Sequence, residues 1–514
     1  MPQRLEPSHP QAHPAVVWLG FMAMCIGMFM AILDVQVVAT SLPTIQAALG
    51  IDPDQMSWIQ TAYLIAEVVA IPLTGFLTRL LTMRWLFVAS IGLFVIASAG
   101  CAISGSFGEL VTWRIIQGFS GGTLIPSVFS AVFLLFAIER QALATTIAGA
   151  LAVFAPTVGP IVGGFLTATY SWHWLFLINI IPGIVSALLA WRSLQKEAGD
   201  VSELRRLDAL SLLMMATTLI CLELSLKEAP TGGWTSPYVL LLLALCLGSA
   251  SVFIWRSLHR NGPVVDLRNF GDRNFLTGSL LSFVLGMGLF GSVYLMPVFL
   301  AFIRGHDALE IGTTMLVTGI AQLITAPIAV ALEKRTDPRL LSALGFAVFA
   351  VGLAMSAFQD PRSDYDAMFW PQVIRGVAIM FCLLPPTRLA LGSLAPERIP
   401  DASGLFNLMR NLGGAIGIAL IDTIIYMRSG PLGQKLWDRL QAGDADAASF
   451  VGVPLAAVTG DTGSADAATM MMLDPLVQIA AAVQAINEAW MTVAALTGCA
   501  IICLPFARRT PILE

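Results

Sequence analysis

Three ionisable side chains interrupt segments of this sequence that are otherwise apolar. Asp34 lies in "MAILDVQVVA", Glu67 in "AYLIAEVVAIP" and Arg114 in "VTWRIIQG". A carboxylate in an apolar setting is harder to ionise when it loses water and easier to ionise beside an arginine. A conformational change that alters either setting would make it take up or release a proton, which is the chemistry of proton coupling. The alternative for each residue is a permanent ion pair that ties helices together.

The depths of these residues favour an interaction between two of them. Asp34 lies nine residues before Pro43, where its apolar helix ends, which corresponds to roughly 13 Å of helix. Arg114 lies about six residues into its own segment from the same side, or roughly 9 Å. Glu67 lies near the middle of its segment. We therefore predict Asp34, Glu67 and Arg114 to be proton-coupling residues, with Asp34 and Arg114 in contact directly or through water.

Polar residues in the second half of the chain are candidates for a substrate path. Asn407 and Arg410 are three residues apart and share one face of a helix. Arg375 lies deep in another apolar segment. A site for organic anions would use such arginines directly, whereas a site for cations would pair them with carboxylates, and both readings stay open. The predicted substrate-path residues are Arg375, Asn407 and Arg410.

The stretch 151–167, "LAVFAPTVGPIVGGFLT", concentrates proline and glycine in an apolar segment. Its small residues recur every four positions and form one ridge, along which a neighbouring helix can approach closely. The prolines remove backbone donors and bend the helix. We predict a hinge and outer seal where two halves meet; the alternative is an ordinary kinked packing helix. The predicted gating residues are Ala155, Pro156, Gly159, Pro160, Gly163 and Gly164.

The composition indicates a membrane protein and not a soluble one. The chain has 514 residues, of which 57% are hydrophobic and 12% charged, and its mean hydropathy is +0.79. Soluble proteins carry about 25% charged residues. The run 15–33, "AVVWLGFMAMCIGMFMAIL", can span a bilayer and is too long for the core of a cleaved signal peptide. The sequence therefore predicts an all-α polytopic membrane protein, with fourteen apolar stretches long enough to cross.

Charge and weak internal similarity predict the organisation. Most of the 28 Lys and Arg residues fall in alternate connecting segments, which places both termini in the cytoplasm. "WRIIQG" (113–118) and "PQVIRG" (371–376) occupy equivalent spans of two halves, a frequent plan for secondary transporters. The predicted parts are a cytoplasmic tail (1–14), an N-terminal six-helix bundle (15–192), a connector with two inserted spans (193–273), and a C-terminal six-helix bundle (274–514) that includes an outer loop (428–487).

Several classes of function are poorly supported. The net charge is −5 and there is no basic run, which argues against nucleic-acid binding. The five histidines and seven cysteines form no metal-ligand pattern. No phosphate-binding loop for ATP and no hydrolase motif is present. We therefore expect a transporter and not an enzyme, with no metal and no cofactor, powered by an ion gradient.

Four motifs together resemble one family. They are "LDVQVVATSLP" (33–43), "RIIQGFSGGTLIP" (114–126), "APTVGPIVGG" (155–164) and "NLMRNLGGAIG" (407–417). The combination is similar to the major facilitator superfamily, in its fourteen-span drug:proton antiporter branch of the EmrB/QacA type. The resemblance implies the major facilitator fold, two six-helix bundles plus two inserted helices. It also implies a helix-packing motif at Gln117, Gly118, Gly121, Gly122 and Pro126.

The same resemblance implies a function. It implies proton-driven efflux of amphipathic drugs or toxic organic compounds by alternating access, across the inner membrane of a bacterium. Asp34 would be a protonation site and Arg114 a proton relay or packing residue. A periplasmic membrane-fusion adaptor and an outer-membrane channel would be partners, and the outer loop 428–487 is where they would touch. The alternatives are an exporter dedicated to one metabolite, lipid or siderophore, and a non-transporting membrane scaffold or sensor.

Other segments carry separate expectations. The loop "GFLTRLLTMRW" (75–85) departs from the family pattern, with Arg79 where the pattern has Asp and Thr82 where it has Gly. Glu223 lies near the end of a span, where we expect its carboxylate to reach water. "MMMLDPLVQIAAAVQAI" (470–486) is predicted as an amphipathic helix near the membrane surface.

Overall fold

The computed structural model describes residues 13–39, 41–197, 199–200, 202–205, 207–260, 262–455, 458 and 467–508. The predicted tail before His13 lies outside the described residues, as does the middle of the predicted outer loop, 459–466. All regular secondary structure in the described residues is helical, which confirms the predicted all-α class.

The helices follow the apolar segments of the sequence. The first part of the chain contains α1 (Pro14–Ala39), α2 (Leu42–Leu49), α3 (Pro53–Ala70), η1 (Ile71–Leu73), α4 (Thr74–Ile103), α5 (Phe107–Leu135), α6 (Ile138–Thr169), α7 (Trp174–Leu177) and α8 (Ile180–Ser193). The middle contains α9 (Ser202–Arg205), α10 (Ala209–Gly232), α11 (Pro237–His259) and η2 (Leu267–Gly271). The last part contains α12 (Arg273–Phe302), α13 (Ala308–Glu333), α14 (Pro338–Met355), α15 (Tyr365–Leu391), η3 (Pro396–Arg398), α16 (Ile399–Gln441), α17 (Ala445–Val451), α19 (Ala467–Cys499) and η4 (Ala500–Phe506).

The number of crossings agrees with the predicted fourteen. Thirteen helical segments of the described chain are long and apolar enough to cross a membrane. One of them, Gln55–Ile103, has 49 residues, about twice the length of an ordinary span. It is interrupted at Thr82, whose φ of 71° and ψ of 160° are not helical. The chain reverses there, so this segment makes two crossings and the total is fourteen.

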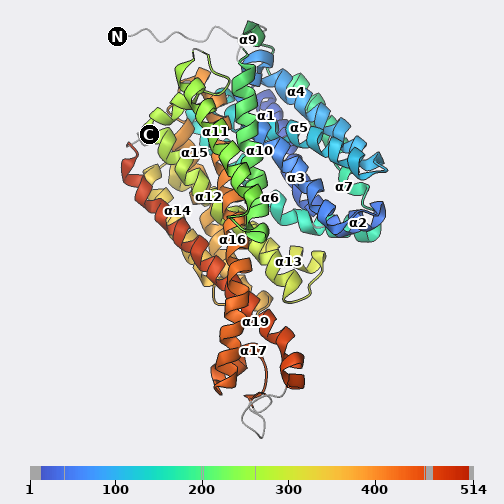
Figure 1. Cartoon of the computed structure of the whole chain (residues 1–514). Helices are drawn as coiled ribbons and strands as arrows, with labels where there is room; N and C mark the ends of the chain where they lie inside the picture. The colour runs from blue at the N-terminus through green and yellow to red at the C-terminus, as the bar shows by residue number, and fades with distance from the viewer. Residues whose placement is uncertain are drawn as a thin grey trace.

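Figure 1 shows the helices as one elongated bundle with two distinct ends. We call the end that carries α9 the connector face and the opposite end, where α17 projects, the insertion face. α1 begins and η4 ends at the connector face. The first helices, α1 to α8, and the last, α12 to α19, form two groups, and α10 runs along the seam between them.

Helix contacts define how the two groups meet. α6 packs along α13 and also touches α15, while α16 packs against α4, α5 and η1. The inserted helix α10 packs against α11, and it also touches both α3 and α16. α10 therefore covers one side of the seam and contacts each group. Asp208 accepts hydrogen bonds from Arg256 of α11 at 2.7 and 3.1 Å, and this holds the pKa of Asp208 well below its usual range.

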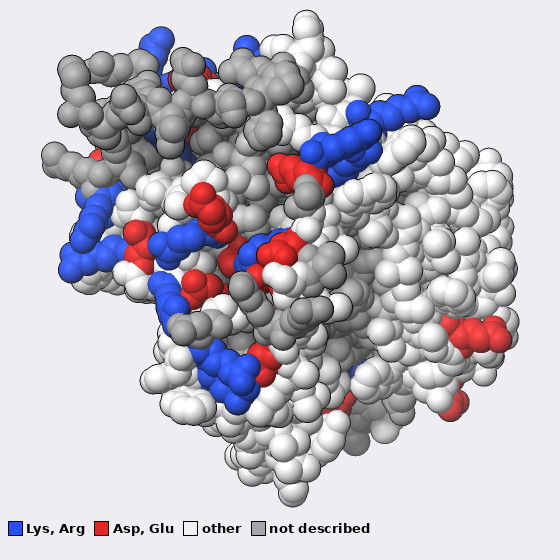
Figure 2. Space-filling model, turned by 90° about the horizontal axis from the view of Figure 1, so that it is seen from above, with Lys and Arg blue, Asp and Glu red and all other residues white. Residues whose placement is uncertain are grey.

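At the connector face the two groups are joined by polar contacts. Arg79 forms an ion pair with Asp401 at the start of α16 and a second with Glu203 of α9 at 3.4 Å. Ser403 Oγ donates a hydrogen bond to the carbonyl oxygen of Pro126 in α5, at 2.8 Å. Basic and acidic side chains gather over one part of this face, which Figure 2 shows from above. Arg79, which stands where the family pattern has Asp, is thus a basic residue that pairs with the acidic Asp401 across the seam.

The described part of the predicted outer loop (428–487) is a helical extension of the bundle, which we call the insertion. α16 continues beyond the bundle to Gln441, and α17 and the first half of α19 pack against it. Leu436, Leu440, Val477 and Ala481 are among the buried residues of this small core. The prediction of a surface-lying helix at 470–486 is wrong, because this stretch is the first half of α19 and runs on into the last crossing. Its apolar face is covered by α16 and α17.

We expect Thr82→Gly to stabilise the protein. Thr82 is 5% exposed and its φ and ψ lie in a region that is essentially reserved for glycine. The strain costs about 1–3 kcal/mol, and the hydroxyl has no hydrogen-bond partner among the described residues. Thermal unfolding of the purified variants in detergent measures the effect. Thr82→Ala is the matched control because it removes the hydroxyl but keeps Cβ; a glycine variant no more stable than the alanine variant would contradict the prediction.

Candidate functional site

The predicted partners Asp34 and Arg114 form an ion pair in the interior of the first group of helices. Asp34 Oδ2 accepts a hydrogen bond from Arg114 Nη1. Asp34 is 1% exposed and Arg114 is fully buried. α1 and α5 bring the two residues together because both project from facing helices at the similar depth that the sequence indicates. The expected interaction between the two residues is confirmed and is direct, and their role in proton coupling stays a prediction.

Amide and hydroxyl groups satisfy the rest of the Asp34 carboxylate. Its Oδ1 atom accepts hydrogen bonds from Gln117 Nε2 at 2.9 Å and from Asn179 Nδ2 at 2.7 Å. Gln117 also donates to Ser98 Oγ at 2.9 Å and accepts from Arg114 at 2.7 Å. Two of these partners, Gln117 and Asn179, are at most 1% exposed. The pair therefore sits in a polar network that is closed off from solvent.

Tyr63 of α3 extends this network toward the seam. The guanidinium carbon of Arg114 lies 4.2 Å from the centre of the Tyr63 ring, and Arg114 Nε donates to the carbonyl oxygen of Ile59 at 3.2 Å. The Tyr63 hydroxyl donates to the carbonyl oxygen of Ala31 at 3.2 Å. Tyr63 precedes Glu67 by one helical turn, so the tyrosine and the second predicted carboxylate project from the same side of α3.

The energetic character of the pair follows from its burial. Breaking a buried ion pair by removing one partner costs about 3–5 kcal/mol, because the remaining charge stays buried and uncompensated. Arg114 Nη2 has no hydrogen-bond partner among the described residues, so the site is not fully satisfied even in this arrangement. Asp34 and Arg114 thus hold one another in place. A proton added to Asp34 would remove its negative charge and so weaken the hydrogen bonds that its carboxylate accepts from Arg114, Gln117 and Asn179.

The glycines of the predicted packing motif explain how α3 and α5 come so close. A Cβ atom at Gly118 would lie 2.2 Å from the carbonyl oxygen of Tyr63, and one at Gly122 would lie 2.5 Å from that of Glu67. At Gly121 a Cβ atom would meet the Tyr63 hydroxyl at 2.6 Å. Any larger residue would push α3 away, since real Cβ atoms do not approach other atoms so closely. The motif therefore positions Tyr63 and Glu67 against α5.

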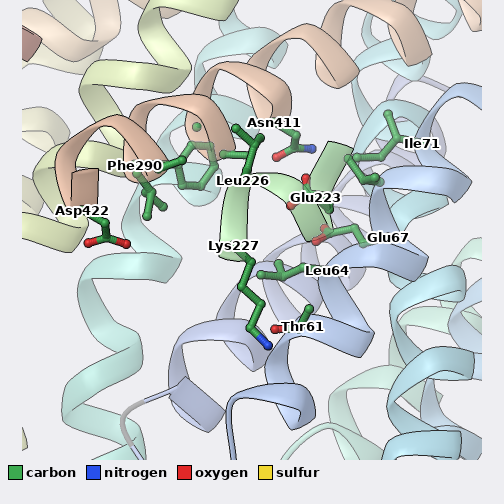
Figure 3. A pocket seen from close by; sticks show the side chains of 15 residues that line it. Thr61, Leu64, Glu67, Ile71, Glu223, Leu226, Lys227, Phe290, Asn411 and Asp422 are labelled. Carbon is green, nitrogen blue, oxygen red and sulfur yellow. The ribbon is translucent and has the colours of Figure 1, made fainter. Parts of the chain in front are cut away.

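Glu67 faces a cavity on the seam. The cavity has a volume of about 260 Å³ and is lined by α3, α10, α12 and α16. Figure 3 shows Glu67 and Glu223 on its wall, with Lys227 and Asp422 also at its edge. Glu67 is 8% exposed. Glu223 is half-buried and its side chain lines this cavity, which the sequence did not indicate; the expectation that its carboxylate reaches water stays a prediction.

The predicted substrate-path residues lie elsewhere. Arg375 is 2% exposed, and its guanidinium lies 4.8 Å from the Trp490 ring, inside the second group of helices. Arg410 lies over Phe129 of α5 at 5.3 Å, and Asn407 donates to the carbonyl oxygen of Ser403 at 2.9 Å. None of the three lines the cavity. Their role in a substrate path stays a prediction.

The predicted gating helix, α6, has two different faces. Its small-residue ridge faces α1, where a Cβ atom at Gly159 would lie 2.3 Å from Gln36 Cβ. Ala155 and both prolines, Pro156 and Pro160, are buried. The contact with the other group is made instead by larger residues, with Ile161 against Gly312 of α13. α6 thus lies where the two groups meet, but Gly159 of the predicted ridge serves the packing within the first group.

Sequence reasoning did not assign three residues to the site. Tyr63 and Asn179 lie in apolar segments as single polar groups, and only their distance in space from Arg114 and Asp34 identifies them. Glu223 did carry a signal, since it interrupts the apolar run "ICLELSL" (220–226). Its position near the end of the span concealed that this helix borders the seam.

Comparisons with known proteins agree with this architecture. Residues 24–418 match the model of the Major Facilitator Superfamily. The chain is 39% identical over 408 residues to "Colistin resistance protein EmrB" of Acinetobacter baumannii, covering 79% of this chain and 80% of that protein. It is 32% identical to "Multidrug export protein EmrB" of Escherichia coli K12, covering 78% and 79%. Among solved structures, the human organic anion transporter MFSD10 matches with a TM-score of 0.60 at 12% identity, covering 96% of this chain and 100% of that one, which supports the fold alone.

Arg114→Lys is expected to lower transport about tenfold while the protein still inserts, since a lysine keeps the charge but not the fork of donors. A lysine cannot contact Asp34, Gln117 and the Ile59 carbonyl together. Transport assays in cells that lack their own pumps measure this, with protein level in the membrane followed in parallel. Arg140→Lys, at an exposed position of α6, is the matched control. Equal transport by both variants would contradict the requirement for the several N–H donors of the Arg114 guanidinium.

Gly159→Leu is expected to impair transport and leave membrane insertion intact. Overfilling a close contact costs about 1–3 kcal/mol, and the new side chain would displace α1 from α6. Gly248→Leu provides the control, because Gly248 of α11 is exposed and no atom lies within 4 Å of its added Cβ. Normal transport by Gly159→Leu would refute the requirement for close packing.

Proposed function

The chain belongs to the Major Facilitator Superfamily, and we propose that it exports amphipathic drugs or toxic organic compounds in exchange for protons. It is a membrane transporter of the EmrB type and not an enzyme. The observation that carries the proton coupling is the dry network around Asp34, which extends to Tyr63, one helical turn from the cavity-lining Glu67.

The mechanism that we propose uses this connection. A substrate in the cavity lies beside Glu67, on one side of Tyr63, while the Asp34–Arg114 pair lies on the other. A proton on Asp34 weakens its hold on Arg114, because the negative charge is removed, and a proton on Glu67 makes that part of the cavity wall neutral. Proton and substrate therefore favour different arrangements of the two helix groups, which is the requirement for alternating access. Asp34, Glu67 and Arg114 are the proposed coupling residues.

The sidedness and partners are part of the same proposal. We place the connector face in the cytoplasm of a bacterium, because its loops carry most of the basic residues. The N-terminal bundle is then 15–192, the connector with its inserted helices 193–273, and the C-terminal bundle 274–514. On this placement the insertion, with α17, projects outward from the inner membrane, where a membrane-fusion adaptor and an outer-membrane channel would dock. No cofactor is required.

The experiment compares Asp34→Asn with wild type in proteoliposomes and in a pump-deficient host. An imposed pH gradient is expected to drive dye export by the wild type, and the variant is expected to lose gradient-driven transport because its side chain cannot take up a proton. A susceptibility panel in the host identifies the substrates. Glu139→Gln, at an exposed position of α6, is the control.

The outcomes separate the alternatives. Unchanged resistance and unchanged gradient-driven flux in Asp34→Asn would sink its coupling role. Export of one compound alone would reject the broad pump in favour of a dedicated exporter. Absence of any gradient-dependent flux in the wild type would favour a scaffold or sensor.

A further inference from the structure

The inserted helix α10 borders the cavity as a third wall. It contacts α3 of the first group and α16 of the second. At the far end of α10, Trp234 Nε1 donates to Thr423 Oγ1 of α16 at 3.0 Å, and Lys227 Nζ lies 4.4 Å from the centre of the Trp58 ring in α3. α10 therefore contacts the helices on both sides of the seam, and its residues Glu223, Leu226 and Lys227 line the cavity.

Two carboxylates from different parts of the chain meet on this wall. Glu67 comes from α3 and Glu223 from α10, and they lie near enough for their charges to repel one another. Within the described part of the chain, neither carboxylate has a hydrogen-bond or ion-pair partner. Glu67 is 8% exposed, so more than nine tenths of its surface is buried. An unpartnered buried carboxylate aimed into a cavity points to a ligand that supplies the missing positive charge.

The nearby lysine does not supply that charge. Lys227 follows Glu223 by four residues on the same helix, the spacing at which an ion pair would form. Its only ion pair among the described residues is with Glu228, at 3.9 Å. In Figure 3 its side chain runs away from Glu67 and Glu223. Asp422, at the other side of the cavity, accepts a hydrogen bond from the Tyr294 hydroxyl at 2.6 Å.

Apart from Thr61 and Asn411, the rest of the lining has no polar side chain. Leu64, Val68, Leu226, Phe290 and Ile418 surround the carboxylates. A cavity with an apolar wall and a few convergent charges fits an amphipathic ligand whose charge is opposite in sign. Three of the four charged groups on the lining are carboxylates, so that sign is positive.

We propose that Glu67 and Glu223 together form a binding site for lipophilic organic cations, so that the inserted helix α10 supplies a specificity residue. This inference rests on the proposed export function and names the substrate class of its cavity. α10 then acts as part of the binding site, in addition to closing the side of the seam.

The test is direct binding of two ions that have the same shape and opposite charge, tetraphenylphosphonium and tetraphenylborate, to the purified full-length protein at one alkaline pH. Wild type is expected to bind the cation more tightly than the anion. Glu223→Gln and Glu67→Gln are each expected to weaken cation binding about tenfold, the scale of a lost interaction with a charged group. Neither variant is expected to weaken anion binding. Glu223→Lys is expected to reverse the preference, and Glu139→Gln, at an exposed position, is expected to change nothing.

The outcomes distinguish this inference from the export function. Cation affinity of Glu223→Gln within about twofold of wild type, or equal weakening of both ions, would overturn the role of α10. A wild type that prefers the anion would overturn the cation site, even if it exports other compounds along a pH gradient. A wild type that binds the cation selectively but moves nothing along the gradient would keep the site and refute the export function. Size-exclusion profiles confirm that each variant is folded.

Discussion

The structure depends on one constraint, which is that a charge inside a membrane protein must find its partner within the protein. Lipid offers no hydrogen bonds, so an unpaired charge is costly. Asp34 meets the constraint with Arg114 and Gln117 of α5 and with Asn179, which lies just before α8, all in the first group. The close approach of α3 and α5, which the glycines from Gly118 to Gly122 permit, follows from the same need, because it brings Tyr63 onto Arg114.

The two groups of helices are arranged around what this network leaves unpaired. They are joined firmly at the connector face, where Arg79 pairs with Asp401 and Ser403 reaches Pro126. Further along the seam they enclose the cavity in which Glu67 and Glu223 have no partner among the described residues. A protein that leaves such carboxylates unpaired has a place for a proton or a cationic ligand. The inserted helix α10 makes that place deeper, since it closes the side between α3 and α16.

Much of this could be predicted from the sequence, and the reasons are physical. Crossing helices are local objects set by about 20 apolar residues, so their number and the all-α class could be read directly. The Asp34–Arg114 pair was predictable because both residues lie at a similar depth and charges in lipid seek partners. The role of Glu223 was not predictable, because it depends on which side of α10 faces the seam. Likewise the ridge of Gly159 indicated a close contact but not that α1 is the neighbour. The stretch 470–486 misled because a helix covered by α17 has the same apolar face as one that lies on a membrane.

The central claim is that protons and a cationic ligand compete for the carboxylates Glu67 and Glu223 on the cavity wall. The most direct measurement is the pH change of a lightly buffered solution of the purified protein when tetraphenylphosphonium is added. The account predicts that the wild type releases protons as it binds the ion, and that Glu67→Gln releases fewer. Binding of the ion by the wild type without any release of protons would contradict it.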